Sequence, residues 1–122
     1  MKLIDSSSWI HALRIDGDPA IRERVHQLLV KDEAAWCDIV RVELWRGVSK
    51  RREISFLKEL ERNIRLLPIT TEVWNLACEL AQKWRVKGTP IPTTDIAIGA
   101  CARVHKVELE HVDKHFDVIR KL

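Results

Sequence analysis

The chain has 122 residues, of which 46% are hydrophobic and 32% charged, and its formal net charge at pH 7 is +3. This length suits one compact domain, residues 1–122, and excludes a separate substrate or regulatory domain within it. The mixed charges exclude a disordered chain and a dedicated basic nucleic-acid-binding tail, although they are compatible with an anionic partner.

Apolar spacing and capping residues predict the elements of the first half. Short apolar runs favour strands, whereas apolar residues that recur every three or four positions favour helices. Asp18 followed by Pro19 is typical of an N-cap and a first helical residue, and Asp38 is expected to cap the next helix. The predicted elements are a strand over Lys2–Asp5 that ends at a polar cluster, a helix from Asp18 to about Val30, a strand over Ala34–Cys37 and a helix from Ile39 to about Val48.

The second half continues this alternation of helices and strands. Its elements are a helix with Ile54, Leu57, Leu60 and Ile64 on one side, a strand over Arg65–Ile69, a long helix from Thr70 or Thr71 to Gly88, a loop at Thr89–Pro92, a helix from Asp95 to about His105 and a strand over Val107–Val112. Such alternation predicts an α/β domain with a mostly parallel central sheet and helices on both faces.

Two acidic residues, Asp5 and Asp113, each end a predicted strand. In an open parallel sheet, ligands bind outside the carboxyl ends of the strands, so both side chains are candidates for a site. Taken singly, either residue is equally well explained as a turn or cap residue, because aspartate hydrogen-bonds its own neighbouring backbone.

Glu43 is more informative because it lies within the apolar arc of its predicted helix, between Ile39 and Gly47. A carboxylate buried without a partner costs several kcal/mol, roughly, unless it is paired, protonated or bound to a cation. We therefore expect Glu43 to face other carboxylates. Pairing with Arg41 or Arg46 is the structural alternative.

Asp95 opens a helix that is apolar almost all round and must therefore be buried. Gly99 and Ala102 lie on the same face as Asp95, so this helix can approach its neighbours closely and hold the carboxylate inside the molecule. The alternative is a favourable interaction with the helix dipole, with Asp95 as the first helical residue after a Thr94 cap.

Together, Asp5, Glu43, Asp95 and Asp113 would form an oxygen-ligand site suited to Mg²⁺ or Mn²⁺. Such a site supports hydrolysis of a phosphodiester bond, because the cation activates water and neutralises the phosphate. Basic residues on both sides of Glu43 in the sequence fit contact with a nucleic-acid backbone, or simply a solvated helix face. These residues are Arg41, Arg46, Lys50, Arg51 and Arg52.

Two histidines, His111 and His115, have the four-residue spacing of helical metal ligands. A transition from strand to loop is expected between them, so we predict no metal role for this pair.

Four motifs carry a resemblance to a known family: LIDSSSWI with Asp5, VRVELWRGV with Glu43, PTTDIAIGACA with Asp95 and HVDKHFDVI with Asp113. In order and spacing they resemble PIN-domain proteins, specifically the VapC-type toxins of toxin-antitoxin systems. The resemblance implies an endoribonuclease that uses Mg²⁺ or Mn²⁺ at these four acids, cuts cellular RNA, often forms a homodimer and is blocked by a small antitoxin protein. The chain departs from the usual pattern at His111, where threonine or serine is common.

Other protein classes with acids at strand ends fit this sequence less well. A receiver domain would have adjacent acids after the first strand, and a haloacid-dehalogenase-type phosphatase a second aspartate two residues after the first, where this chain has Ser7. A PIN-type RNA-processing nuclease that is no toxin, and a PIN-like module that binds RNA or protein without cutting, stay open. The complete set of four acids favours a nuclease over the binding module.

The cysteines and the apolar runs predict the compartment. Cys37, Cys78 and Cys101 lie far apart in apolar surroundings, as expected of free thiols in a reducing environment. The first residues lack the apolar core of a signal peptide, and no apolar stretch approaches the roughly 20 residues that span a bilayer. We expect a cytoplasmic protein without a membrane anchor.

Overall fold

A four-stranded parallel sheet forms the centre of the computed structural model, which describes residues 1–85 and 90–122. Its strands are β1 (Lys2–Ile4), β2 (Ala34–Trp36), β3 (Arg65–Leu66) and β4 (Glu108–Glu110). They lie in the order β3-β2-β1-β4, and every neighbouring pair is parallel. The predicted parallel sheet is confirmed, and all its carboxyl ends lie along one edge.

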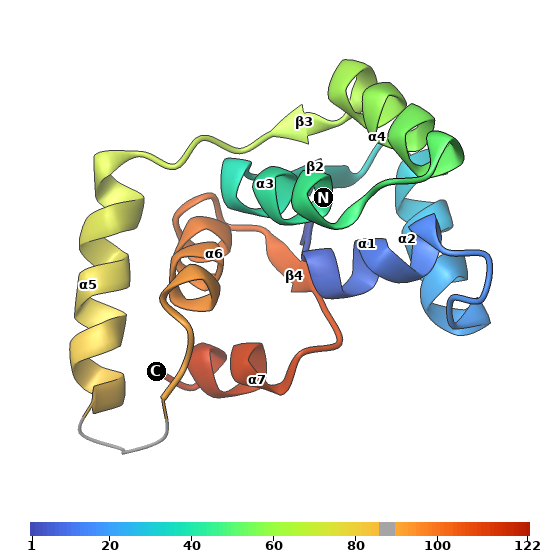
Figure 1. Cartoon of the computed structure of the whole chain (residues 1–122). Coiled ribbons are helices and arrows are strands. Elements are labelled where there is room, and N and C mark those ends of the chain that lie inside the picture. The colour runs from blue at the N-terminus through green and yellow to red at the C-terminus, as the bar shows by residue number, and fades with distance from the viewer. Residues whose placement is uncertain (86–89) are drawn as a thin grey trace.

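Helices flank this sheet on two sides. In Figure 1, α5 and α6 lie to the left of the strands, α1, α2 and α4 lie to the right, and α7 crosses below α6 and β4. The described helices are α1 (Ser6–Leu13), α2 (Pro19–Val30), α3 (Asp38–Gly47), α4 (Arg51–Asn63), α5 (Thr71–Arg85), α6 (Thr93–Val104) and α7 (Lys114–Arg120). The α/β architecture predicted from the alternating patterns is therefore confirmed.

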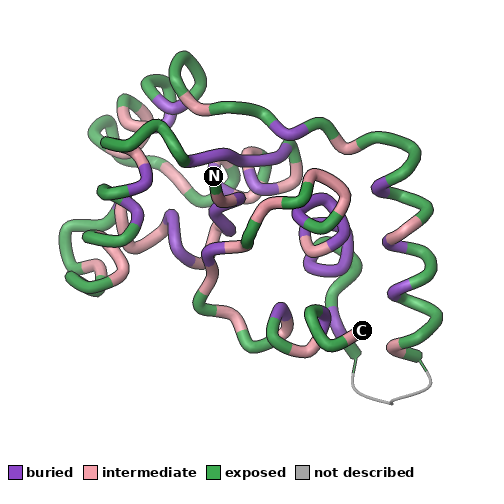
Figure 2. The backbone as a smooth tube through the Cα atoms, turned by 180° about the vertical axis from the view of Figure 1, so that it is seen from behind, coloured by how far each residue is buried: buried purple, intermediate pink, exposed green. Residues whose placement is uncertain are grey.

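The core lies between the central strands and the helices that cover them. Leu3 and Ile4 of β1 are fully buried, and all of β2 is buried, as expected of strands covered on both faces. Trp9 of α1 packs edge-on against Trp36 with ring centroids 6.3 Å apart. Figure 2 shows buried residues concentrated in the central strands and along α6, whose helix is apolar on nearly every side. This burial makes α6 a rigid support for its first turn.

Several predicted boundaries were wrong. Helix α1 was not predicted: it begins directly after β1, where the sequence indicated only a polar cluster. Asp38 is the first residue of α3 and not its cap, which is Cys37. Helix α6 is preceded by Pro92, so Thr94 is no cap and Asp95 is its third residue. Helices α3 and α6 thus begin one and two residues earlier than the polar side chains suggested.

The outer strands are shorter than predicted. Strand β3 covers Arg65–Leu66 alone, since the chain leaves the sheet before Pro68, and β4 ends at Glu110. The predicted helix end at Gly88 and the start of the following loop at Thr89 lie outside the described residues. Within residues 1–85 and 90–122, no helix is both long enough and apolar enough to cross a membrane.

Candidate metal centre

Asp5 lies at the carboxyl end of β1 and caps helix α1. Its Oδ2 accepts a hydrogen bond of 3.0 Å from the backbone N–H of Ser7. The residue is only 3% exposed, and its Oδ1 is buried with no hydrogen-bond partner among the described residues. An ionised carboxylate in this position is destabilised unless a cation or a proton binds to it.

Glu110 shows how the same fold satisfies a buried carboxylate that has a purely structural role. This residue is 8% exposed, and its Oε1 accepts a hydrogen bond of 2.6 Å from Nε of Arg24. Nζ of Lys2 lies 3.9 Å from the other oxygen. Asp5 has no such ion pair within the described part of the chain. Glu110 therefore belongs to an ion pair, whereas Oδ1 of Asp5 has no partner among the described residues.

Glu43 lies on α3 and reaches toward Asp5. The hydroxyl of Ser6 donates a hydrogen bond of 3.1 Å to Oε1 of Glu43. Partial burial is the main cause that raises the pKa of Glu43, the charge of Asp5 adds to it, the Ser6 hydrogen bond opposes it, and Asp95 and Asp113 make smaller contributions. Glu43 is half-buried and not fully buried as predicted.

The alternative in which arginine neutralises Glu43 finds no support. Nε of Arg41 lies 2.9 Å from Oε1 of Glu61, and its Nη1 lies 2.6 Å from Oδ1 of Asp38, so this guanidinium is already paired. Among the described residues, neither Arg41 nor Arg46 forms an ion pair with Glu43. Glu43 therefore faces other acids without a cationic partner.

Asp95 projects from the first turn of α6 and is 8% exposed. Burial is the largest cause that raises its pKa; a hydrogen bond from His115 opposes this effect, and the charges of Asp113 and Asp5 strengthen it. The charges of Asp5 and Asp113 act on both Glu43 and Asp95, so the four predicted acids lie near one another in the fold.

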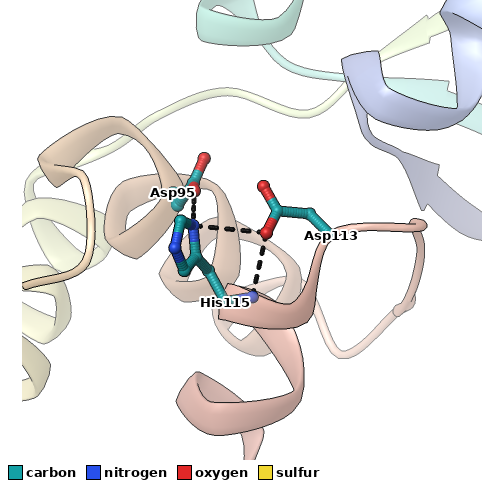
Figure 3. A group of neighbouring side chains, drawn as sticks. All are labelled: Asp95, Asp113 and His115. Carbon is teal, nitrogen blue, oxygen red and sulfur yellow. Dashed lines mark hydrogen bonds and ion pairs between the residues drawn. The ribbon is translucent and has the colours of Figure 1, made fainter. Parts of the chain in front are cut away.

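Asp113 and His115 complete the cluster at the start of α7. Asp113 caps this helix: its Oδ1 accepts a hydrogen bond of 2.9 Å from the backbone N–H of His115. The imidazole Nδ1 of His115 lies 2.9 Å from Oδ2 of Asp95 and 3.2 Å from Oδ1 of Asp113 (Figure 3). His115 thus joins the first turns of α6 and α7.

The other residues considered near Asp113 point elsewhere. The side chain of Asp117 is 57% exposed, and its Oδ1 lies 3.6 Å from Nε2 of His111. His111 itself packs against Phe116, with ring centroids 5.1 Å apart. The predicted strand-to-loop transition between the two histidines was wrong, because β4 ends at Glu110, before both of them. Their side chains nevertheless have different partners, and His115 lies among the acids, where no role was predicted for it.

The donor set fits a divalent cation. One ligand atom from each of Asp95, Asp113 and His115 can be chosen so that all three lie within 4.8 Å of one another. Carboxylate oxygens are the ligands that Mg²⁺ and Mn²⁺ prefer. Burial and the charges of neighbouring acids raise the pKa values of Glu43 and Asp95, and a bound cation would offset both effects. The buried, unpartnered Oδ1 of Asp5 supplies a further oxygen on the side of β1.

Comparison with known proteins supports the same fold. Three solved structures resemble this chain closely in fold. VapBC2 from Rickettsia felis, bound to a DNA fragment from its promoter, matches with a TM-score of 0.81 and 21% identity over 99% of this chain and 94% of that chain. VapBC-5 from Mycobacterium tuberculosis, a member of the VapBC family of toxin-antitoxin systems, matches with a TM-score of 0.69 and 16% identity over 97% and 89% of the two chains. VapC20 from the same organism, described as a sarcin-ricin loop cleaving toxin, matches with a TM-score of 0.68 and 19% identity over 97% and 94%.

The family itself is identified by sequence. No curated protein matches the chain significantly. The family model of the PIN domain, however, matches residues 2–122. The chain belongs to the PIN-domain family.

Proposed function

We propose that this protein is a metal-dependent endoribonuclease that hydrolyses RNA phosphodiester bonds and serves as the VapC-type toxin of a toxin-antitoxin pair. One observation carries the proposal: four carboxylates from distant parts of the chain meet at the carboxyl edge of the sheet, and Oδ1 of Asp5 is buried there without a partner. A bound cation is the simplest way to satisfy such a cluster, because leaving it unpaired costs several kcal/mol, roughly.

In this proposal Asp5, Glu43, Asp95 and Asp113 hold Mg²⁺ or Mn²⁺. When bound, the cation supplies activation of water and neutralisation of the phosphate. The protein's own part is to position these groups: the backbone after β1 fixes Asp5, and the buried α6 fixes Asp95. Ser6 holds Oε1 of Glu43, and we assign to Oε2 of the same carboxylate the acceptance of a proton from attacking water.

Basic residues beyond Glu43 would contact the RNA backbone. Arg41 is paired with Glu61 and Asp38, and Arg52 donates a hydrogen bond of 3.0 Å to the carbonyl oxygen of Leu13. These two arginines therefore have structural roles. We assign phosphate contact to the exposed residues Arg46, Lys50 and Arg51, which follow Glu43 along the end of α3 and the start of α4.

The proposed partners follow the similar structures, which include toxin-antitoxin systems and an RNA-cleaving toxin. We expect a small antitoxin that covers the acidic cluster, a homodimeric protein and a cytoplasmic location. In cells, expression of this chain alone should slow growth, and co-expression of the protein encoded beside it should restore growth.

The biochemical test uses the purified full chain and cellular RNA. We expect cleavage with Mg²⁺ or Mn²⁺ and none with excess chelator. Equal cleavage in both conditions would contradict the metal requirement.

The remaining alternatives give distinct outcomes. Metal-dependent cleavage combined with harmless expression would favour a PIN-type RNA-processing nuclease. Binding of RNA without cleavage under any metal condition would favour a binding module.

A further inference from the structure

His115 places a nitrogen atom in a cluster whose other candidate ligands are carboxylate oxygens. Its Nδ1 lies 2.9 Å from Oδ2 of Asp95 and 3.2 Å from Oδ1 of Asp113. Figure 3 shows one imidazole nitrogen in contact with both carboxylates, which lie above and to one side of the ring. One ligand atom from each of Asp95, Asp113 and His115 lies within 4.8 Å of the other two. A metal ion held by the two carboxylates would therefore be within reach of this nitrogen.

The backbone fixes the imidazole in this position. Asp113 caps α7 and accepts a hydrogen bond of 2.9 Å from the backbone N–H of His115. The Asp113 carboxylate therefore contacts both the backbone and the imidazole ring of His115. This hydrogen bond limits the rotation of the Asp113 carboxylate, as hydrogen bonds to metal ligands commonly do. The side chain of His115 is 40% exposed, which leaves the site open to solvent on this side.

An independent observation points to a ligand at the same place. Oδ1 of Asp5 is buried and has no hydrogen-bond partner among the described residues, although Asp5 belongs to a different element from Asp95 and His115. The charge of Asp5 acts on both Glu43 and Asp95, so this orphaned oxygen belongs to the same cluster. A cation between these elements would satisfy it.

We propose that Nδ1 of His115 is a metal ligand and that it shifts the preference of this centre from Mg²⁺ toward Mn²⁺. The inference rests on the proposed function in one respect, namely that a divalent cation binds at these acids. Mg²⁺ keeps almost entirely to oxygen ligands, whereas imidazole nitrogen suits first-row transition metals. Mn²⁺ accepts carboxylates and water as Mg²⁺ does, and it also tolerates a nitrogen ligand. A centre of several carboxylates and one imidazole therefore favours Mn²⁺ over Mg²⁺.

The alternative role of His115 is that of an imidazolium that only bridges Asp95 and Asp113. In that case its nitrogen would leave the carboxylates when a metal binds, and metal preference would not depend on it. The two roles differ in whether a histidine nitrogen is bonded to the metal.

The experiment measures metal binding by the full chain without RNA. Mn²⁺ is titrated and followed by electron paramagnetic resonance, and the bound ion is then examined by electron spin-echo modulation for a directly bonded histidine nitrogen. Wild type should show this nitrogen, and labelling the histidines with ¹⁵N should change the modulation. His115→Ala should lose it and bind Mn²⁺ at least about tenfold more weakly. His26→Ala, which removes an exposed histidine of α2, should match wild type.

A competition experiment measures selectivity. In His115→Asp, which restores an all-oxygen set, we expect Mg²⁺ to displace Mn²⁺ at a concentration at least about tenfold lower than in wild type. Mn²⁺ bound to wild type without a histidine nitrogen would overturn the inference and leave the proposed function intact. Failure of wild type to bind either metal would contradict the proposed function itself. The ¹⁵N comparison uses wild type alone, so the outcome does not depend on whether either variant folds.

Discussion

Oγ of Ser6 lies 3.1 Å from Oε1 of Glu43, to which it donates a hydrogen bond across 37 positions of sequence. Ser6 is the first residue of α1, directly after Asp5, whereas Glu43 lies on α3. This hydrogen bond therefore couples the backbone that carries one acid to the side chain of another. It gives Glu43 a fixed orientation even though the residue is only half-buried.

Ser6→Ala should slow RNA cleavage by about fivefold, since a hydrogen bond of this kind contributes about 1 kcal/mol. The hydrogen bond lowers the pKa of Glu43, so its loss should raise that pKa further and move the acidic limb of the kcat/KM profile to higher pH. The profile is measured at saturating metal. Ser55→Ala, an exposed serine of α4, is the control, and a profile for Ser6→Ala identical to it would show that Glu43 needs no such positioning.

Asp113→Asn should reduce cleavage by at least about tenfold, roughly 1.4 kcal/mol of transition-state stabilisation. Asparagine can still cap α7, so this change removes the charge near Asp95 and His115 but keeps the helix start. Asp117→Asn should have little effect, because its side chain is 57% exposed and lies beside His111. Cleavage rates of the two variants at saturating metal show which aspartate belongs to the site. A larger loss at Asp117 would place the fourth acid one helical turn further along the chain.

Asp5→Asn should abolish metal binding while stabilising the metal-free protein by something on the order of 1 kcal/mol. The amide oxygen can still accept the hydrogen bond from Ser7, whereas the lost charge no longer acts on Glu43 and Asp95. Urea unfolding with and without Mn²⁺ measures both effects. Asp16→Asn, an exposed aspartate, should keep the full stabilisation by metal. If Asp5→Asn were stabilised by Mn²⁺ as strongly as wild type, Asp5 would not be a ligand.

The metal-free protein should lose stability as pH rises above the ordinary pKa values of its raised carboxyls, 4.5 for Glu43 and 3.8 for Asp95. The unfolded chain releases these protons at the ordinary values, whereas the folded chain holds them to higher pH. In this window the folded state therefore binds more protons, and the free energy of unfolding falls with rising pH. At pH 7, metal at a hundred times its dissociation constant should restore about 2.7 kcal/mol.

Glu43→Gln isolates the contribution of one group to this pH dependence. The free energy of unfolding of wild type minus that of the variant should decrease as pH rises through the window, because only wild type carries the titrating carboxyl. Unfolding curves at a series of pH values, with chelator present, measure the difference. A difference that stays constant with pH would show that Glu43 titrates as in the unfolded chain.

The parallel sheet was predictable because its strands leave local signals in the sequence, and the same signals led to the four candidate acids. Apolar runs around Leu3 and Ala35 indicate buried strands, and Asp5, directly after β1, lies by geometry at the carboxyl edge. Asp113 was predicted to follow its strand directly, which is wrong, because β4 ends at Glu110 and Asp113 caps α7. The uniformly apolar composition of α6 indicates burial by itself. For these features, local pattern and global fold agree.

The role of His115 and the helical start at Ser6 could not be read in the same way. His115 meets Asp95 only because α7 begins at Lys114 and packs beside α6, and no local spacing encodes that contact. Helix α1 begins with three serines, which are weak helix formers, and is stabilised by the Asp5 cap and by the burial of Trp9. In both cases tertiary packing decides the structure. One available signal was the Asp113 cap, which would have predicted a helix that carries His115 in its first turn.

The most direct test of the account is the rate of cleavage of a defined RNA as a function of Mn²⁺ concentration, compared between wild type and Asp95→Asn. Asparagine keeps the shape of a residue that is 8% exposed and removes its charge from the cluster. We predict that the wild-type rate rises with Mn²⁺ to a plateau and vanishes in chelator, and that Asp95→Asn stays at least about a hundredfold slower at every concentration. Equal rates for the two proteins, or undiminished cleavage by wild type in chelator, would contradict the claim that these carboxylates hold a catalytic metal.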